Sequence, residues 1–267
     1  MIYRSLLFVP GARPDRFEKA LGAGADVVCI DLEDGTPPHQ KDEARAAAAA
    51  FRANGRAGVR INGVGTPEFE ADCAAIRAVE GCALIMVPKI ESPDQVALVR
   101  DCLGPDQAPL WVVIETAEGL RQAWDIAAAP GVAGVLFGGA DYSVDIGSDM
   151  EWDALAFARG ALVAASARAG VQLLDVPYLD IRDAEGLTAS TLRVRAMGFT
   201  GRACIHPDQV AGVNAAFTPS EAQVAHARKV IETFEAAAGG PALLNGKLID
   251  LPILRAANRT LENIRRA

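Results

Sequence analysis

The chain has 267 residues, of which 51% are hydrophobic and 22% charged, and its formal net charge is −8. This length suits one large domain, because single barrels often reach roughly 200–250 residues. The negative charge argues against a general binder of nucleic acid or of anionic membranes. No apolar run approaches the length that spans a bilayer.

The N-terminal stretch and the cysteines indicate a cellular compartment. MIYRSLLFVPGARP contains too short an apolar run for a signal sequence and is better explained as a first strand. The five cysteines form no CxxC pair, which argues against a zinc ribbon and against a disulfide framework. The sequence therefore predicts a reduced, cytoplasmic protein.

Eight short runs of aliphatic and β-branched residues recur along the chain and predict eight buried strands. Near-continuous hydrophobicity is typical of parallel strands that are buried on both faces. The runs cover residues 4–10, 26–34, 57–62, 83–90, 109–116, 132–139, 172–178 and 201–207.

Amphipathic segments rich in Ala, Glu and Arg separate these runs, and three of them have a helix-start pattern. Ser92-Pro93-Asp94-Gln95 offers an N-cap serine, a proline at the first helical position and a glutamine at the third. Thr66-Pro67-Glu68 and Thr218-Pro219-Ser220-Glu221 repeat this pattern, and Ala46–Ala50 is predicted to be helical. Eight strand–helix alternations predict an α/β fold, a (β/α)8 TIM barrel, rather than a doubly wound sheet. No GxGxxG follows the first strand, which weakens the dinucleotide-binding alternative.

The C-terminal part of the chain is predicted to extend the barrel. The predicted catalytic barrel covers residues 1–237 and ends with a helix at 219–236. The hinge-like AGGP at 238–241 follows, and residues 238–267 form a predicted lid or extension with a helix of its own. The alternative is a terminal helix that only plugs the barrel.

Ionisable residues concentrate where the predicted strands end. Barrel active sites lie at the carboxyl ends of the strands, so this concentration predicts an enzyme. The residues are Asp31, Glu33, Asp34, Arg60, Lys89, Glu115, Asp141, Asp175 and His206.

The acids at these strand ends predict a metal site, because crowded carboxylates repel one another unless a cation neutralises them. Oxygen ligands without a His/Cys cluster favour Mg²⁺ or Mn²⁺ over zinc. Glu115 and Asp141 follow neighbouring strands and are the natural pair of ligands. Asp34 and Asp175 suit salt bridges to Arg60 and Lys89, or caps of the following helices.

The stretch VLFGGAD at 135–141 explains how substrate would reach the metal. Gly138, Gly139 and Ala140 keep side chains away, and their backbone N–H groups are free to meet an anionic oxygen. The alternative is a glycine-rich turn in which Asp141 caps the next helix.

The cationic residues at the same end allow two interpretations each. Arg60 could grip the carboxylate of a small keto or hydroxy acid, or it could neutralise Asp31 or Glu33. Lys89 could form a Schiff base or pair with the acids of DLED, and the ion pair is favoured because a metal already accounts for electrophilic catalysis. His206 is interpreted as part of a strand-end turn.

Seven motifs, in order along essentially the whole chain, resemble the HpcH/HpaI aldolase and citrate lyase β-subunit family. They are LLFVPGARPDRFEKA, DVVCIDLEDGTPP, VRINGVGT, VPKIESPDQV, IETAEG, GGADYSVDIG and GFTGRACIHPDQV. The resemblance implies a Mg²⁺-dependent (β/α)8 lyase, a homotrimer or hexamer, that acts on malyl-, citramalyl- or citryl-CoA.

The resemblance also implies roles for individual residues. Glu115 and Asp141 would be the metal ligands, and Arg60 would bind the keto-acid carboxylate. Substrate would contact Arg60, Glu115, Gly139 and Ala140. Coenzyme A would contact Phe8, Arg16, Lys19 and the backbone around Ala203-Cys204.

Two segments add to this interpretation. Arg13, Arg16 and Lys19 recur every three residues, so a helical start would place them on one face that suits phosphates, or that simply forms a solvated basic edge. The motif NGKLIDLP resembles the C-terminal lid of malyl-CoA and citramalyl-CoA lyases, which implies that Asp250 transfers a proton in a neighbouring subunit's active site.

The predicted reaction is a reversible Claisen-type cleavage to acetyl-CoA and a 2-keto acid, with Asp250 or a water molecule protonating the enolate. Three alternatives stay open. They are a class I aldolase that uses Lys89, a class II aldolase that acts on free hydroxy-keto acids, and a citrate lyase β subunit that works only with an acyl carrier protein.

Overall fold

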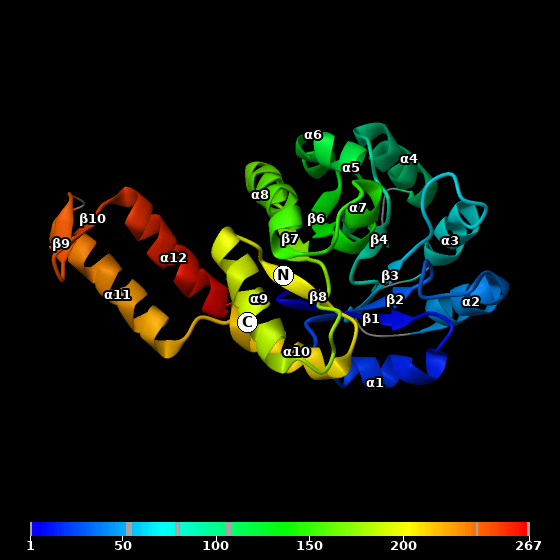
Figure 1. The fold of residues 1–267 in the computed structure, drawn as a ribbon, viewed down its shortest axis with the longest axis horizontal. Coiled ribbons are helices and arrows are strands. Elements are labelled where there is room, and N and C mark those ends of the chain that lie inside the picture. Colours follow the sequence, from blue (N-terminus) through cyan, green and yellow to red (C-terminus); the bar gives the residue numbers. More distant parts are fainter. Residues whose placement is uncertain are drawn as a thin grey trace. The chain divides into compact units, whose positions relative to one another are not determined.

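The computed structural model describes residues 2–51, 55–77, 79, 81–104, 108–238 and 240–265. Its central feature is a closed barrel of eight parallel strands arranged in chain order (Figure 1). The strands are β1 Ser5–Pro10, β2 Val27–Asp31, β3 Ala57–Arg60, β4 Ile85–Val87, β5 Leu110–Ile114, β6 Val132–Phe137, β7 Gln172–Asp175 and β8 Gly201–Cys204. Strand β1 pairs with both β2 and β8, which closes the barrel. All eight predicted strands are confirmed, each somewhat shorter than its apolar run.

The helices that precede the eighth strand follow the strands in sequence and lie around the outside of the barrel (Figure 1). Short 3-10 turns η1 Pro14–Arg16 and η2 Pro38–Gln40 precede the first two of them. The helices up to the eighth strand are α1 Phe17–Leu21, α2 Lys41–Ala50, α3 Phe69–Ile76, α4 Pro93–Leu103, α5 Ala117–Arg121, α6 Ala123–Ala127, α7 Gly139–Asp145, α8 Trp152–Ala169 and α9 Ala184–Met197. After β8 come α10 Pro207–Phe217, α11 Glu221–Ala236 and α12 Leu251–Arg265. Within the described ranges, no helix is long and apolar enough to cross a membrane.

The barrel interior is filled by side chains from the strands. Leu6, Leu84, Trp111 and other buried residues form one apolar cluster. Gly134 on β6 makes room for the largest of them, because a Cβ at this position would lie 2.5 Å from the Trp111 ring. The bottom of the barrel is therefore a packed core, and the chemistry is confined to the carboxyl ends of the strands.

Local capping patterns predicted two helix starts, one of them two residues too early. Ser92 caps α4, and its hydroxyl accepts a hydrogen bond from the Gln95 N–H, as predicted. At α11 the cap is Ser220, which forms a reciprocal capping box with Gln223, rather than Thr218. Thr218 and Ser220 both offer a capping hydroxyl, but only Ser220 is followed three residues later by a side chain, that of Gln223, which can complete the capping box.

The third predicted helix start is wrong. Helix α3 begins at Phe69, and the Thr66 hydroxyl donates to the Gly63 carbonyl oxygen at 2.8 Å, which stabilises the preceding turn and caps no helix. The alanine run Ala46–Ala50 lies in α2, as predicted.

The chain divides into two compact units, of which Tyr3–Asn214 contains the barrel. The other unit comprises Ile2 and the described residues from Ala215 onward. It has its own small core, to which Val230 and Phe234 of α11 and Ala257 of α12 contribute. The compact units thus divide at 214/215, whereas the predicted domain boundary lay at 237/238, because α11 packs against α12.

A β-hairpin that was not predicted joins α11 to α12. Its strands are β9 Ala242–Leu244 and β10 Lys247–Ile249, which pair antiparallel. Asn245 and Gly246 form the turn and both have positive φ, the conformation that Asn-Gly favours in two-residue hairpins. The helix predicted in the tail is confirmed as α12, and Gly239 of the predicted hinge lies outside the described residues.

Candidate active site

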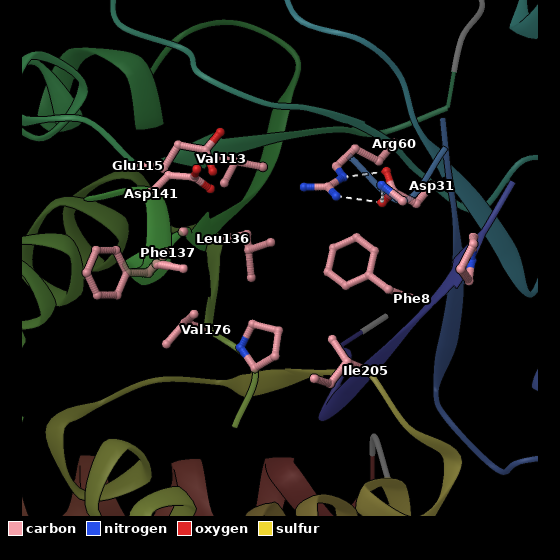
Figure 2. Close-up of a pocket in the computed structure, with 15 residues that line it drawn as sticks. Phe8, Asp31, Arg60, Val113, Glu115, Leu136, Phe137, Asp141, Val176 and Ile205 are labelled. Carbon is pink, nitrogen blue, oxygen red and sulfur yellow. Dashed lines mark hydrogen bonds and ion pairs between the residues drawn. The ribbon is translucent and has the colours of Figure 1, made fainter. Parts of the chain in front are cut away.

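A cavity of about 280 Å³ opens among the carboxyl ends of the barrel strands (Figure 2). Five of the predicted site residues line it together, although they come from four different strand ends. They are Phe8, Arg60, Glu115, Ala140 and Asp141. The predicted substrate contact Gly139 is buried and does not line the cavity, whereas its neighbour Gly138 does.

Glu115 follows β5 and is only 2% exposed. Its Oε1 accepts a 2.8 Å hydrogen bond from the backbone N–H of Lys89, a residue with a left-handed φ of 54°. A Cβ on Gly138 would lie 2.4 Å from its Oε2, so only glycine leaves room for this carboxylate. Backbone from two neighbouring loops therefore fixes the position of Glu115.

Asp141 lies in the first turn of α7, where its exposed side chain approaches Glu115 (Figure 2). It does not cap this helix, whose N-cap residue is Gly138, so the capping alternative is wrong. Burial, with smaller contributions from the charges of Asp141 and Glu33, raises the pKa of Glu115 to about 8. The two carboxylates are thus arranged so that their negative charges are costly without a cation.

The other charges at the barrel mouth neutralise one another. Arg60 donates to both carboxylate oxygens of Asp31, at 2.7 and 2.6 Å, and its Nη1 lies 2.9 Å from Glu33. Lys89 pairs with Glu33 at 2.8 Å. Two cations therefore balance two acids, and Arg60 has the neutralising contacts of its alternative interpretation (Figure 2).

Glu115 and Asp141 stand outside this balance. No side-chain nitrogen of a lysine, arginine or histidine within the described ranges lies within 4.0 Å of either carboxylate. Nor do the described residues contain a group of three or more His, Cys, Asp or Glu side chains placed to hold a metal. Two unpaired carboxylates and no soft ligand fit Mg²⁺ or Mn²⁺, since Mg²⁺ usually takes only one or two protein carboxylates and fills its remaining positions with water and substrate.

Apolar side chains line the rest of the cavity. Phe8 lies under Arg60, with the guanidinium 4.9 Å from the ring centre, and Val113, Val176 and Ile205 add to this lining. The three aliphatic residues could not be predicted as site residues, because a hydrophobic strand end has the same sequence pattern whether it lines a core or a cavity.

A second cavity of about 490 Å³ holds the predicted basic residues. Arg13, Arg16 and Lys19 all line it, although Arg13 precedes the 3-10 turn instead of lying within a helix. It shares Phe8, Pro10 and Ile205 with the first cavity. The two spaces are therefore neighbours at the mouth of the barrel.

Three further candidate site residues lie outside the first cavity. Cys204 is completely buried, lines neither cavity, and has a thiol pKa raised to about 12 by burial. His206 lines the second cavity, 3.5 Å from Asp208. Asp250 lies in the C-terminal unit, where its carboxylate accepts a hydrogen bond from the Ile253 N–H at the start of α12.

The interpretations of Lys89, Asp175 and Asp34 are tested by their contacts. The hydrogen bond to Glu33 raises the pKa of Lys89, which keeps the amine protonated and confirms the ion pair. Asp175 is fully buried and forms a structural salt bridge, but its partners are Arg159 and Arg202 instead of the predicted Arg60 and Lys89. Asp34 is exposed and lines neither cavity.

Comparisons with known proteins agree with this geometry. The sequence profile of the family described as HpcH/HpaI aldolase/citrate lyase matches residues 4–207. A (3S)-malyl-CoA thioesterase from Cereibacter sphaeroides is 36% identical over 270 residues, which cover 97% of this chain and 93% of that protein. An L-malyl-CoA/β-methylmalyl-CoA lyase from Rhodobacter capsulatus is 34% identical, with 95% and 92% covered. The crystal structure of CitE from Mycobacterium tuberculosis in complex with magnesium, acetoacetate and coenzyme A matches with a TM-score of 0.87 and 33% identity, over 99% of this chain and 98% of that one.

Proposed function

Since this chain belongs to the HpcH/HpaI aldolase/citrate lyase family, we propose that it is a metal-dependent carbon–carbon lyase that cleaves a β-hydroxyacyl-CoA thioester to acetyl-CoA and a 2-keto acid. Malyl-CoA, citramalyl-CoA and citryl-CoA are the candidate substrates. The observation that carries the proposal is the pair Glu115 and Asp141, which lines one cavity with Arg60 and has no cationic partner among the described residues.

Glu115 and Asp141 are the residues that would hold Mg²⁺, with Mn²⁺ as the alternative. A bound Mg²⁺ supplies positive charge that stabilises the developing alkoxide, an effect of several kcal/mol in comparable enzymes. The backbone contacts of Glu115 with Lys89 and Gly138 keep this ligand in place before metal and substrate arrive. The magnesium complex of the similar CitE supports this assignment.

Arg60 would orient the carboxylate of the keto-acid half of the substrate. Its two hydrogen bonds to Asp31 use two of the five N–H donors of the guanidinium and hold the group rigid. Its Nη1 also pairs with Glu33, so only the N–H groups that these two acids do not use are available to a carboxylate in the cavity. The ion pairs of Arg60 and its binding role are therefore compatible.

The adjoining basic cavity suits the coenzyme A portion. Phosphates would pair with Arg16 and Lys19, while Phe8, shared by both cavities, would contact the chain that leads to the thioester. Gly139 and Ala140 stay proposed substrate contacts through the first turn of α7, and the backbone around Ala203-Cys204 stays a proposed contact of coenzyme A.

Cleavage of the carbon–carbon bond leaves an acetyl-CoA enolate that needs a proton. Asp250, or a water molecule, would donate it, and in reverse the same group would deprotonate acetyl-CoA. We propose a homotrimer or hexamer in which the segment 238–267 closes an active site. All five cysteines are free thiols, which supports a reduced, cytoplasmic enzyme.

The relatives favour one second candidate, hydrolysis of the thioester. A (3S)-malyl-CoA thioesterase is among the most similar proteins, and such an activity releases free CoA and a hydroxy acid with the carbon skeleton intact. The products separate the two reactions, because only a lyase forms acetyl-CoA and a keto acid.

The test is an incubation with malyl-, citramalyl- and citryl-CoA, each with Mg²⁺ and with EDTA, in which acetyl-CoA, free CoA and keto acid are quantified. Metal-dependent acetyl-CoA release is expected from one of them. The Asp141→Asn variant should be inactive. The control is Asp34→Asn, which changes an exposed strand-end acid outside both cavities and should stay active. A fully active Asp141→Asn enzyme overturns the metal assignment. Activity that appears only after addition of an acyl carrier protein would identify a citrate lyase β subunit. Cleavage of free hydroxy-keto acids but of no CoA thioester would identify a class II aldolase.

A further inference from the structure

A third cavity, of about 530 Å³, lies beside the ends of β7 and β8 and the first turns of α8 and α9. Val176 and Pro177 line both this space and the candidate active site, so the two are separated by the segment that follows β7. Three arginines line it, Arg159, Arg193 and Arg202, and none of them has a part in the proposed reaction.

Two of these arginines are buried and share one acid. Arg159 is 4% and Arg202 2% exposed, and both pair with the fully buried Asp175, at 3.0 and 2.9 Å. Burial lowers the pKa of Arg202 despite the attraction of Asp175. Two guanidiniums and one carboxylate leave one positive charge uncompensated in the interior, which is costly unless a further anion pairs with it.

The hydrogen bonds locate this excess on Arg159. Arg202 donates to the carbonyl oxygen of Val176, to the hydroxyl of Thr191 and to Asp175, so each of its nitrogens has an acceptor. The Nη1 of Arg159 is buried and has no hydrogen-bond partner. A buried guanidinium nitrogen without an acceptor is the kind of group that a ligand satisfies.

Arg193 adds a second cation at the same place. Its guanidinium lies 3.7 Å from the centre of the Trp152 ring, and that of Arg159 lies 4.8 Å from the same ring. This contact with the indole face uses no N–H group of Arg193, so its donors can meet an anion. The exposed side chain forms no ion pair with any acid in the described ranges.

The acids that line the cavity do not compensate these charges. Glu151 and Asp180 are exposed, and among the described residues neither carboxylate lies within 4.0 Å of a side-chain nitrogen of an arginine. Asp180 accepts a hydrogen bond from the Arg182 N–H and so stabilises its own turn. Water screens such exposed carboxylates far more than it screens the buried Arg159.

We propose that this cavity binds a small organic anion, whose carboxylate or phosphate group pairs with Arg159 and Arg193. The carbon skeleton would lie against Val176, Pro177 and Leu179, which give the cavity an apolar wall. A volume of about 530 Å³ is in the range of small-molecule sites. The site is distinct from the basic cavity of Arg13, Arg16 and Lys19, which shares no residue with it.

The test is calorimetric titration of the full chain in EDTA with succinate and with inorganic phosphate, each compared with sodium chloride at equal ionic strength. Succinate probes a carboxylate ligand and phosphate probes a phosphorylated one. Arg193→Gln removes an exposed cation, so the variant should fold. Its Kd for the active probe, meaning whichever of succinate and phosphate binds to the parent protein, should rise at least about tenfold. The control Arg195→Gln removes the same charge from the same helix at a position outside the cavity.

The variants also separate this site from the other two. Anions bound at Arg60 or in the basic cavity would keep their affinity in Arg193→Gln, and that result would overturn the proposal. Binding no tighter than chloride by either probe would overturn it as well. Arg159→Met leaves Asp175 and Arg202 in one-to-one balance, and we expect it to abolish binding of the active probe while the protein stays folded in circular dichroism.

Discussion

Replacing Gly138 with alanine is the most direct perturbation of the candidate metal site. A Cβ at this position would lie 2.4 Å from Oε2 and 2.5 Å from Cβ of Glu115. Oε2 is at the flexible end of its side chain, but Cβ is attached to the backbone directly after β5. Both the side chain and the backbone must therefore move.

The size of the effect follows from these distances. Ordinary van der Waals contact begins at 3.4 Å, so the carboxylate must retreat by about 1 Å from its 2.4 Å approach. A 1 Å misplacement of a catalytic group can lower the rate about 100-fold. Overpacking typically costs about 1–3 kcal/mol of stability, so the fold should survive.

The assay is steady-state acetyl-CoA release as a function of Mg²⁺ concentration, with thermal unfolding measured in parallel. We expect kcat to fall about 100-fold and half-saturation by Mg²⁺ to shift to higher concentration. Gly160→Ala is the matched control, because nothing lies within 4 Å of a Cβ there and the position is inside α8. It should leave activity unchanged and add about 0.5–1 kcal/mol of stability. A Gly138→Ala enzyme with the parent rate and Mg²⁺ dependence would refute the reasoning.

Three further predictions address the charged groups. In metal-free protein the pKa of Glu115, raised from 4.5 to about 8 chiefly by burial, means that the folded state holds a proton that the unfolded chain has lost. This stabilisation is complete below about pH 4.5 and disappears as pH rises through 8. Thermal unfolding in EDTA should therefore show a loss of stability over this range in the parent protein, and the Glu115→Gln variant should not show it. Asp175→Asn should cost about 3–5 kcal/mol in urea unfolding, because it leaves two buried guanidiniums without a carboxylate; a change below 1 kcal/mol would contradict this. Lys89→Met should lose at most about 1 kcal/mol and keep its activity, since the Lys89 side chain is 48% exposed and forms an ion pair. Borohydride trapping of substrate on Lys89 would show a Schiff base instead.

The sequence was most informative about the barrel, because a strand buried on both faces has to be hydrophobic along its whole length. The helix ends were less certain, since Thr218 and Ser220 both offer a capping hydroxyl and the position of Gln223 decides between them. The hairpin before α12 had a local signal in Asn245-Gly246 that the predicted hinge and helix obscured. Helix α11 belongs to the same compact unit as α12 because the two helices pack on each other. No local sequence pattern shows such packing.

For the site, strand order predicted that Glu115 and Asp141 would meet, because neighbouring parallel strands end at the same edge. The support for Glu115 could not be predicted. It depends on the left-handed backbone of Lys89 and on a contact that only a missing side chain at Gly138 allows. The uncompensated charge of Arg159 is likewise a property of three-dimensional pairing, since the sequence alone does not show that two arginines share one acid.

The acids at the barrel mouth divide by whether a cation faces them. Asp31 and Glu33 are neutralised by Arg60 and Lys89, so their contribution is to hold Arg60 in one orientation. Burial and the charge of Asp141 disfavour the ionised form of Glu115, so the ionised pair opposes folding in the absence of metal and gives free energy back when a divalent ion binds. A substitution in the first pair should therefore change the orientation of substrate, whereas one in the second pair should change the affinity for metal. Mg²⁺ titrations of Asp31→Asn and Asp141→Asn, read by thermal unfolding, distinguish the two effects without any need for turnover.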